Sequence, residues 1–210
     1  MSFASVSFLL FFLVVLLLLL LVQRVLPFAE IKRRIICQGI LLIASYVFYG
    51  WWNMRLCLLL MGITWISFFT AVKKDEKHLR QSRISLLIGV GTPLAVLGIF
   101  KYYDFFVTSF CEVFHLTPGV LNLILPVGIS FYTFQALSYT IDVYTGKIEK
   151  EKSFLQFALY LSFFPQLVAG PIVKASEFLP QLKENRKVTL SGLESGIQIF
   201  VFGMFKKVVL

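Results

Sequence analysis

The feature that most restricts this chain is a run of 20 uncharged, mostly aliphatic residues from Phe3 to Val22. A helix rises about 1.5 Å per residue, so about 20 apolar residues cross a hydrocarbon core about 30 Å thick. No Lys or Arg precedes the run, and no small-residue cleavage site follows it. The pattern therefore predicts a retained membrane span and not a cleaved signal peptide.

Further apolar segments follow the first, separated by short polar connectors. They are predicted at residues 35–50, 56–72, 84–100, 120–141, 154–173 and 196–210. Hydrophobic residues make up 58% of the chain and charged residues 15%, whereas a soluble domain has about 25% charged residues. The fold class predicted is an all-α, multi-pass transmembrane protein with about seven hydrophobic segments, in which residues 1–210 form the amino-terminal part of a single domain.

The net charge of +9 is unevenly distributed among the connectors. Connectors 23–34, 73–83 and 147–152 hold twelve Lys and Arg residues, whereas the second and fourth connectors hold only Arg55 and Lys101. Cytoplasmic loops are enriched in Lys and Arg because positive segments resist translocation. The basicity is therefore interpreted as a topology signal and not as a nucleic-acid site. It predicts an amino terminus outside and odd-numbered connectors in the cytoplasm.

The sixth connector departs from this alternation, since it carries Lys174, Lys183, Arg186 and Lys187. Two explanations stay open: the sixth segment does not cross fully, or the count of spans is wrong by one there. The polar stretch 174–195 is expected to be a solvated connector, with a contact surface for a partner protein as the alternative.

Prolines and glycines interrupt three of the apolar segments, at 89–93, 125–130 and 162–171. A proline lacks the amide donor and displaces the carbonyl four residues back, and each polar group freed in hydrocarbon costs several kcal/mol. Broken helices of this kind persist where protein or a water-filled cavity surrounds them. They indicate either a polar pathway or re-entrant site, or structural kinks alone. The candidate residues for a substrate tunnel are Pro126, Gly128, Ser130, Tyr132, Gln135, Pro165, Gln166, Gly170 and Pro171.

The apolar segments that are complete contain no Asp, Glu, Lys, Arg or His, which disfavours an ion-coupled transporter. The two histidines, His78 and His115, fall in connectors and are not expected to be catalytic. No nucleophile elbow, phosphate-binding glycine loop or metal-ligand spacing is present in the sequence. Three scattered cysteines are interpreted as small apolar residues. Neither a metal site nor a bound cofactor is predicted.

Two sequence blocks carry a resemblance to a known family. The first covers residues 125–135 and continues through 138–144, and the second covers 163–173 with 178–182. In this order and spacing they resemble hallmark blocks of bacterial membrane-bound O-acyltransferases. The sequence of residues 165–173 is most similar to that of the branch that acetylates polysaccharides such as alginate. The resemblance extends over essentially the whole chain.

The resemblance implies a many-helix enzyme of the bacterial cytoplasmic membrane, with a tunnel across the bilayer. An acyl group, expected to be acetyl, would arrive on a carrier at the cytoplasmic side and pass to hydroxyls of an extracytoplasmic polysaccharide. Periplasmic or extracellular acetyltransferase proteins are further expected partners. The family's catalytic histidine is expected downstream of Leu210, so this chain alone is expected to be inactive. D-alanyl transfer to teichoic acid and a non-enzymatic polysaccharide export component are the alternatives.

Overall fold

The computed structural model describes residues 5–24, 29–72, 78–114, 119, 123–167, 171–184 and 189–209. All regular structure within these residues is helical, which confirms the predicted all-α class. The helices are α1 (Val6–Arg24), α2 (Glu30–Gly50), α3 (Met54–Thr70), α4 (Leu79–Val113), α5 (Ile129–Tyr144), α6 (Phe154–Ser162), α7 (Phe164–Leu167), α8 (Ala175–Lys183) and α9 (Leu190–Val209).

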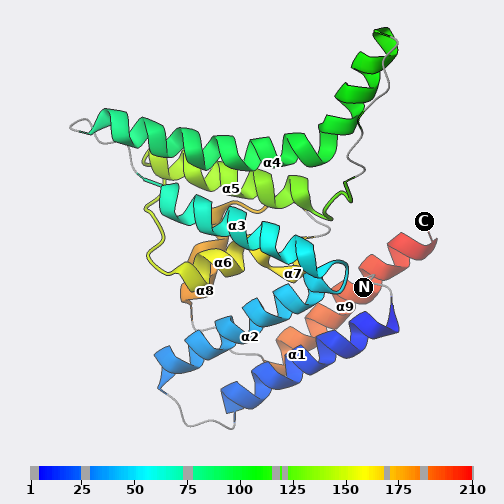
Figure 1. The fold of residues 1–210 in the computed structure, drawn as a ribbon. Coiled ribbons are helices and arrows are strands. Elements are labelled where there is room, and N and C mark those ends of the chain that lie inside the picture. Colours follow the sequence, from blue (N-terminus) through cyan, green and yellow to red (C-terminus); the bar gives the residue numbers. More distant parts are fainter. Residues whose placement is uncertain are drawn as a thin grey trace.

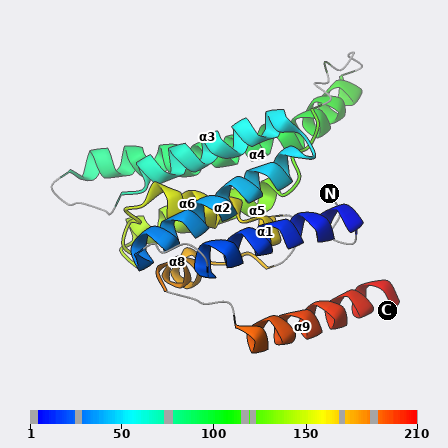
Figure 2. The ribbon, with the colours of Figure 1, turned by 90° about the horizontal axis from the view of Figure 1, so that it is seen from below.

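Helices α1 to α5 lie side by side in a bundle, and α6, α7 and α8 fill its centre and one end (Figure 1). Helix α2 packs on α1, α3 and α6, and α5 packs on α3 and α4. Helix α9 lies apart from the other helices (Figure 2), and most of its described side chains are exposed. The short helix α6 is the most enclosed element, because every residue from Gln156 to Ser162 is buried.

Helices α1 and α4 are, within the described residues, the ones both long and apolar enough to cross a bilayer. Helix α3 and the stretch Phe154–Leu167 are apolar but shorter. These helices coincide with predicted segments one, four, three and six. The number of complete crossings remains a prediction.

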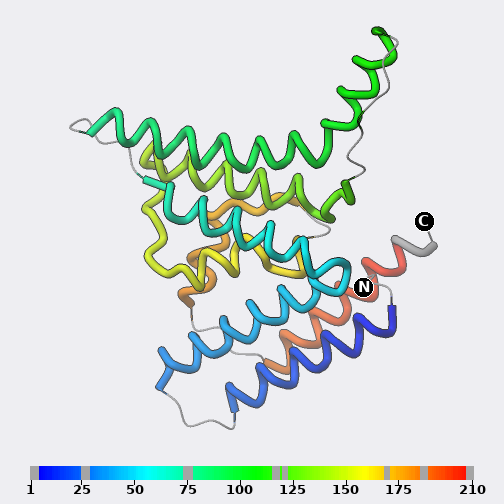
Figure 3. The backbone as a smooth tube through the Cα atoms, in the orientation of Figure 1, coloured from blue at the N-terminus to red at the C-terminus, as the bar shows by residue number. Residues whose placement is uncertain are grey.

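The predicted break at residues 89–93 is wrong. Helix α4 continues through Pro93, which is buried in it, and runs for 35 residues. One proline removes one backbone hydrogen bond, and the remaining turns and the packing against α3 and α5 hold the helix together. The carboxy-terminal end of α4 bends away from the bundle (Figure 3). The glycine at position 89 has a packing role: an added Cβ would lie 2.5 Å from Thr70 Oγ1 and 2.9 Å from Thr140 Cγ2.

The fifth segment also differs from its prediction. Helix α5 begins at Ile129 and not near Val120, and the preceding residues 123–126 have no regular secondary structure. Pro126 and the left-handed backbone of Gly128, with φ of 76°, account for the late start, because neither continues a right-handed helix.

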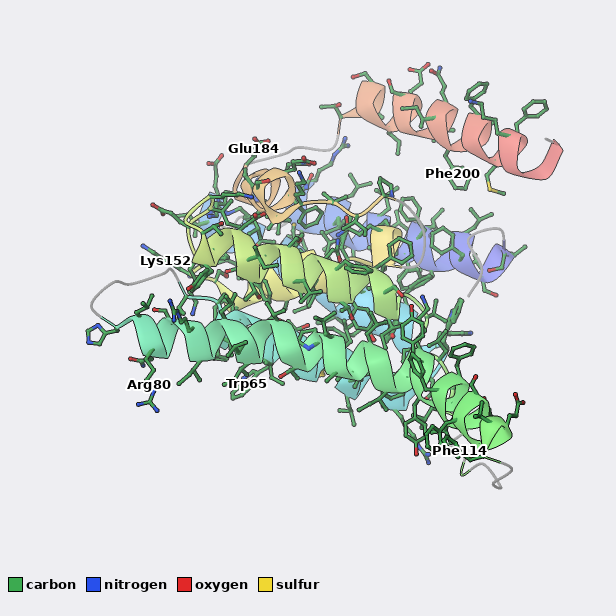
Figure 4. The ribbon with its side chains drawn as sticks, turned by 90° about the horizontal axis from the view of Figure 1, so that it is seen from above. Trp65, Arg80, Phe114, Lys152, Glu184 and Phe200 are labelled. Atoms are coloured by element: carbon green, nitrogen blue, oxygen red, sulfur yellow. The ribbon has the colours of Figure 1, made fainter. Side chains whose placement is uncertain are left out.

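The basic connectors share one end of the bundle, which we call the basic end. Figure 4 places Arg80 and Lys152 at this end and Phe114 at the opposite one. The loop between α5 and α6 contacts α3 there, with Lys150 Nζ 5.4 Å from the centre of the Phe68 ring. Arg80, Lys150 and Lys152 thus lie at one end of the bundle, while the full alternation of charge and its assignment to the cytoplasm remain predictions.

The contact at Gly89 predicts opposite effects of two matched substitutions. Gly89→Ala introduces a collision with α3 and α5, and we expect it to lower the thermal midpoint of the purified protein. Gly91→Ala lies on the same helix with nothing within 4 Å of the added Cβ. It should leave the midpoint unchanged or raise it, since Ala is favoured over Gly in a helix by about 1 kcal/mol. Equal effects of both variants would contradict the packing role.

Candidate functional site

The sixth apolar segment is broken near its middle. Helix α6 has nine residues, so it rises only about 13 Å, less than half of a hydrocarbon core. It ends at Phe163, whose backbone is not helical, and the short helix α7 follows. The chain then continues without helix through residues 171–174 to α8. The break predicted from Pro165 is therefore present.

The segment returns to the end from which it started. The carbonyl of Leu182, near the end of α8, accepts a hydrogen bond of 2.7 Å from Gln38 Nε2, and the carbonyl of Lys183 accepts one from Arg34. Lys183 Nζ lies 2.8 Å from Glu151 Oε2, just before α6 begins. Both ends of the segment thus lie at the basic end, so the segment is re-entrant with respect to the bundle; its path relative to a membrane remains a prediction.

Re-entry explains why the sixth connector is positively charged, since it lies at the same end as the fifth. It also corrects the expectation that residues 174–195 form a solvated connector. Residues 175–183 are helical, and Ala175 and Leu179 are buried against the core. The amphipathic spacing of these two residues, four apart in a polar stretch, was the signal for this helix.

Side chains satisfy the backbone groups that the break leaves free. Ser45 Oγ accepts a 3.2 Å hydrogen bond from the amide of Phe164 and donates one of 2.8 Å to the carbonyl of Leu41 in its own helix α2. Gln166 Nε2 donates a 3.0 Å hydrogen bond to the carbonyl of Tyr160, near the end of α6. The side-chain amide of Gln166, one of the tunnel candidates from sequence, therefore satisfies a carbonyl near the end of the broken helix.

Tyr160 is a site residue that the sequence analysis missed. Its hydroxyl lies 3.2 Å from the carbonyl of Val173 and 3.5 Å from that of Gln135. A phenol has one proton to donate, and the shorter distance indicates Val173 as its acceptor. The fully buried Tyr160 thus holds the non-helical segment at Val173, which leads into α8, beside α5. An isolated tyrosine in an apolar run gave no sequence signal of this role.

An aromatic cluster holds α7 against the first two helices. The Phe164 ring centre lies 5.3 Å from that of Phe11, 5.7 Å from that of Phe48 and 6.5 Å from that of Phe8. These side chains come from α7, α1 and α2. Aromatic pairs of this kind contribute about 0.5–1.5 kcal/mol each beyond the burial of their area, so the cluster holds the break at one depth within the bundle.

The two blocks that carry the family resemblance meet at Gly128. A Cβ built on this glycine would collide with the carbonyl oxygen of Leu167, the last residue of α7. Gly128 therefore satisfies two requirements, a left-handed backbone and close approach to another backbone. We call this contact the block junction.

The structure distributes the other predicted tunnel residues unevenly. Tyr132 and Gln135 are buried in α5, and the Tyr132 ring makes an edge contact with Tyr49 of α2, 6.5 Å between centres. Pro126 is buried and Ser130 half-buried beside the block junction. In contrast, Pro165 and Pro171 are exposed on the outside, and Gly170 lies outside the described residues. The role of these residues as a tunnel wall remains a prediction.

Glu151 is the buried charge of this region, with its side chain 5% exposed. Its Oε1 accepts hydrogen bonds from the amides of Lys152 and Ser153, 2.9 and 3.1 Å long. Burial alone would raise the pKa of Glu151, but the ion pair with Lys183 and these two amides together hold it below its ordinary value of 4.5. The carboxylate thus links the start of α6 to the end of α8.

Other groups that could perform chemistry are sparse in the described part of the chain. No cluster of three or more His, Cys, Asp or Glu that could hold a metal ion occurs among the described residues. His78 is exposed at the start of α4, and His115 lies outside the described residues. Cys57 and Cys111 are buried and Cys37 is half-buried.

Comparison with curated proteins found relatives that are named as O-acetylases or O-acetyltransferases. The chain is 38% identical over 175 residues to a Pseudomonas putida protein named "Probable alginate O-acetylase AlgI", covering 80% of this chain and 36% of the relative. The Pseudomonas aeruginosa protein of the same name is also 38% identical over 175 residues, covering 80% of this chain and 34% of the relative. A Helicobacter pylori "Peptidoglycan O-acetyltransferase" is 36% identical over 197 residues, covering 81% of this chain and 37% of the relative.

These relatives confirm the resemblance predicted from the two blocks. The chain spans about a third of the length of the curated relatives it matches. No protein-family model and no solved structure matches the chain.

The block junction predicts that Gly128→Ala destabilises the protein strongly. The substitution adds a backbone collision to the cost of a left-handed alanine, which is about 1–2 kcal/mol. Gly146→Ala is the matched control, because Gly146 has nearly the same φ of 75° but is exposed in a turn. Thermal unfolding of both purified variants should give a clearly lower midpoint for Gly128→Ala. Equal midpoints would show that the two blocks do not press together at Gly128.

The lowered pKa of Glu151 predicts a pH dependence of stability. A carboxylate whose pKa is lowered in the folded state stabilises that state above its ordinary pKa and loses this contribution as the pH falls through the lowered value. The thermal midpoint should therefore fall between pH 5 and pH 3, by about 2–4 °C per kcal/mol lost. Glu151→Gln should lower the midpoint at pH 7 and flatten its pH dependence. Glu149→Gln, at an exposed position, should keep the wild-type profile.

Proposed function

Because the chain is a homologue of alginate O-acetylases and of a peptidoglycan O-acetyltransferase, we propose that it is part of a membrane-bound O-acyltransferase. The protein transfers an acetyl group to hydroxyls of an extracytoplasmic polysaccharide. The chain matches about a third of each relative, so the transfer is a property of the whole protein.

The observation that carries the proposal is the block junction. Two sequence blocks resemble this family, and Gly128 of the first touches Leu167 of the second, 39 positions later in the chain. The first block leads into the start of α5 and the second interrupts a helix inside the bundle, where side chains of α2, α6 and α7 hydrogen-bond its backbone. Irregular backbone at such a depth is found where it is enclosed by protein or lines a cavity, which supports a substrate passage at this junction.

The chemistry requires a hydroxyl of the polysaccharide to attack the acyl carbonyl of the donor. An ester bond forms, the bond between acyl group and carrier breaks, and a base accepts the hydroxyl proton. The chain contributes an uncharged environment, which suits a neutral acetyl group and excludes water that would hydrolyse the donor. A histidine is the fitting base at neutral pH. We assign it to the remainder of the protein, because His78 is exposed at the basic end.

The charge separation supports an orientation for this reaction. With the basic end in the cytoplasm, the acyl carrier approaches beside α8 and the loop before α6, and the amino terminus lies outside. The polysaccharide and any periplasmic partner protein act at the opposite end. The enzyme would then reside in the bacterial cytoplasmic membrane and use an acyl donor as co-substrate, with no bound cofactor.

The test is to express the full-length protein in a strain whose own polysaccharide acetylation has been deleted. Ester-linked acetate should appear on the polysaccharide, measured by mass spectrometry after mild alkaline release. Residues 1–210 expressed alone should restore none of it. Release of D-alanine in place of acetate would support D-alanyl transfer, and polymer secretion without any ester would support an export component. Restoration by residues 1–210 alone would contradict the assignment of the base to the rest of the protein.

A further inference from the structure

The carboxy-terminal end of α4 leaves the bundle and carries an unusual surface. We call residues 101–114 the α4 arm. Phe100, just before it, still packs against the main core, whereas the arm diverges from α5 at the end opposite the basic end (Figures 1 and 4). The arm is continuous with the rest of α4.

We propose that the α4 arm lies in the lipid headgroup layer and anchors the bundle at that depth. The proposal concerns how the protein sits in the membrane and does not depend on the acyl transfer. It rests on which side chains the arm exposes and on where the arm lies.

Large aromatic residues are exposed around the arm. Phe105, Phe106, Phe110 and Phe114 are exposed by 58–65%, and Tyr102 and Tyr103 by 44% and 38%. Leaving one phenylalanine in water forgoes about 1.5–3 kcal/mol of burial. Four such rings within fewer than three helical turns make an arm extended into water unfavourable.

The same arm cannot lie in the hydrocarbon core at low cost. Lys101 and Glu112 are exposed on it, and a charged side chain at the bilayer centre costs about 2.5–3.5 kcal/mol on insertion scales. The Lys101 ammonium stays close to an aromatic ring, with its nitrogen 5.3 Å from the centre of the Tyr102 ring. Aromatic rings beside charged groups are the composition of the membrane interface, where both are accommodated.

The inner face of the arm is compatible with this placement. Asp104, Val107 and Thr108 are half-buried and Cys111 is buried, at helical spacing. An open hollow of about 530 Å³ lies against Phe106, Phe110 and Cys111. Since Phe114 and Lys152 lie at opposite ends of the bundle (Figure 4), the headgroup layer concerned belongs to the leaflet farther from the basic end.

Spin labelling of the full-length protein tests the proposal. The native cysteines are replaced by Ala or Ser, Phe106→Cys is labelled with a nitroxide, and the protein is reconstituted in phosphatidylethanolamine and phosphatidylglycerol vesicles. Two controls give the limits. Leu87→Cys, 70% exposed in the part of α4 that packs on the bundle, represents the hydrocarbon core, and Glu149→Cys, exposed in the loop at the basic end, represents water. Relaxation by oxygen and by a water-soluble nickel chelate is measured for each label.

The expected result is an oxygen-to-nickel accessibility ratio for Phe106→Cys between those of the two controls. A ratio equal to that of Leu87→Cys would place the arm in the core, and a ratio equal to that of Glu149→Cys would place it in water. A label shielded from both reagents would mean that another protein segment covers the arm. Each of these three outcomes overturns the proposal. Phe110→Cys provides the same measurement if the first variant does not fold.

Discussion

The arrangement of this chain depends on satisfying the backbone where a helix is broken inside an apolar bundle. Water is not available there to replace the lost hydrogen bonds, so side chains must do so. Ser45 accepts from the amide of Phe164, and Gln166 donates to the carbonyl of Tyr160. Without these partners, the break between α6 and α7 would cost several kcal/mol for each free group. The break is tolerated because α2 and the segment's own side chains complete it.

This constraint gives the first two helices a larger part in the site than their sequence indicates. Helix α2 contributes the hydroxyl of Ser45 to the break and the Phe48 ring to the cluster around Phe164. Helix α1 adds Phe8 and Phe11 to that cluster. No residue of these two helices is among the candidate site residues proposed from sequence. In the structure they determine the depth at which the re-entrant segment turns back, and thereby the position of the block junction.

How far the sequence could predict this architecture depends on whether a feature is local. Pro165 interrupted the sixth segment as expected, because a proline removes its own amide wherever it stands. Pro93 did not break α4, because the effect of one missing hydrogen bond depends on the neighbouring helices, and α3 and α5 pack closely on that helix. The late start of α5 could have been anticipated from Pro126 and Gly128. The role of Tyr160 could not, since its partners lie on two other segments.

Composition, the spacing of apolar runs and the placement of charge were enough to establish an all-helical chain suited to a membrane, with its basic connectors at one end. These properties follow from the cost of placing charge or free backbone groups in hydrocarbon, which each segment meets separately. Whether the sixth segment crosses or returns was left open by the same information. It was resolved by contacts between residues far apart in the chain: Arg34 and Gln38 with the end of α8, Lys183 with Glu151, and Gly128 with Leu167. Such contacts depend on how the helices pack in three dimensions, and no local pattern of residues encodes them.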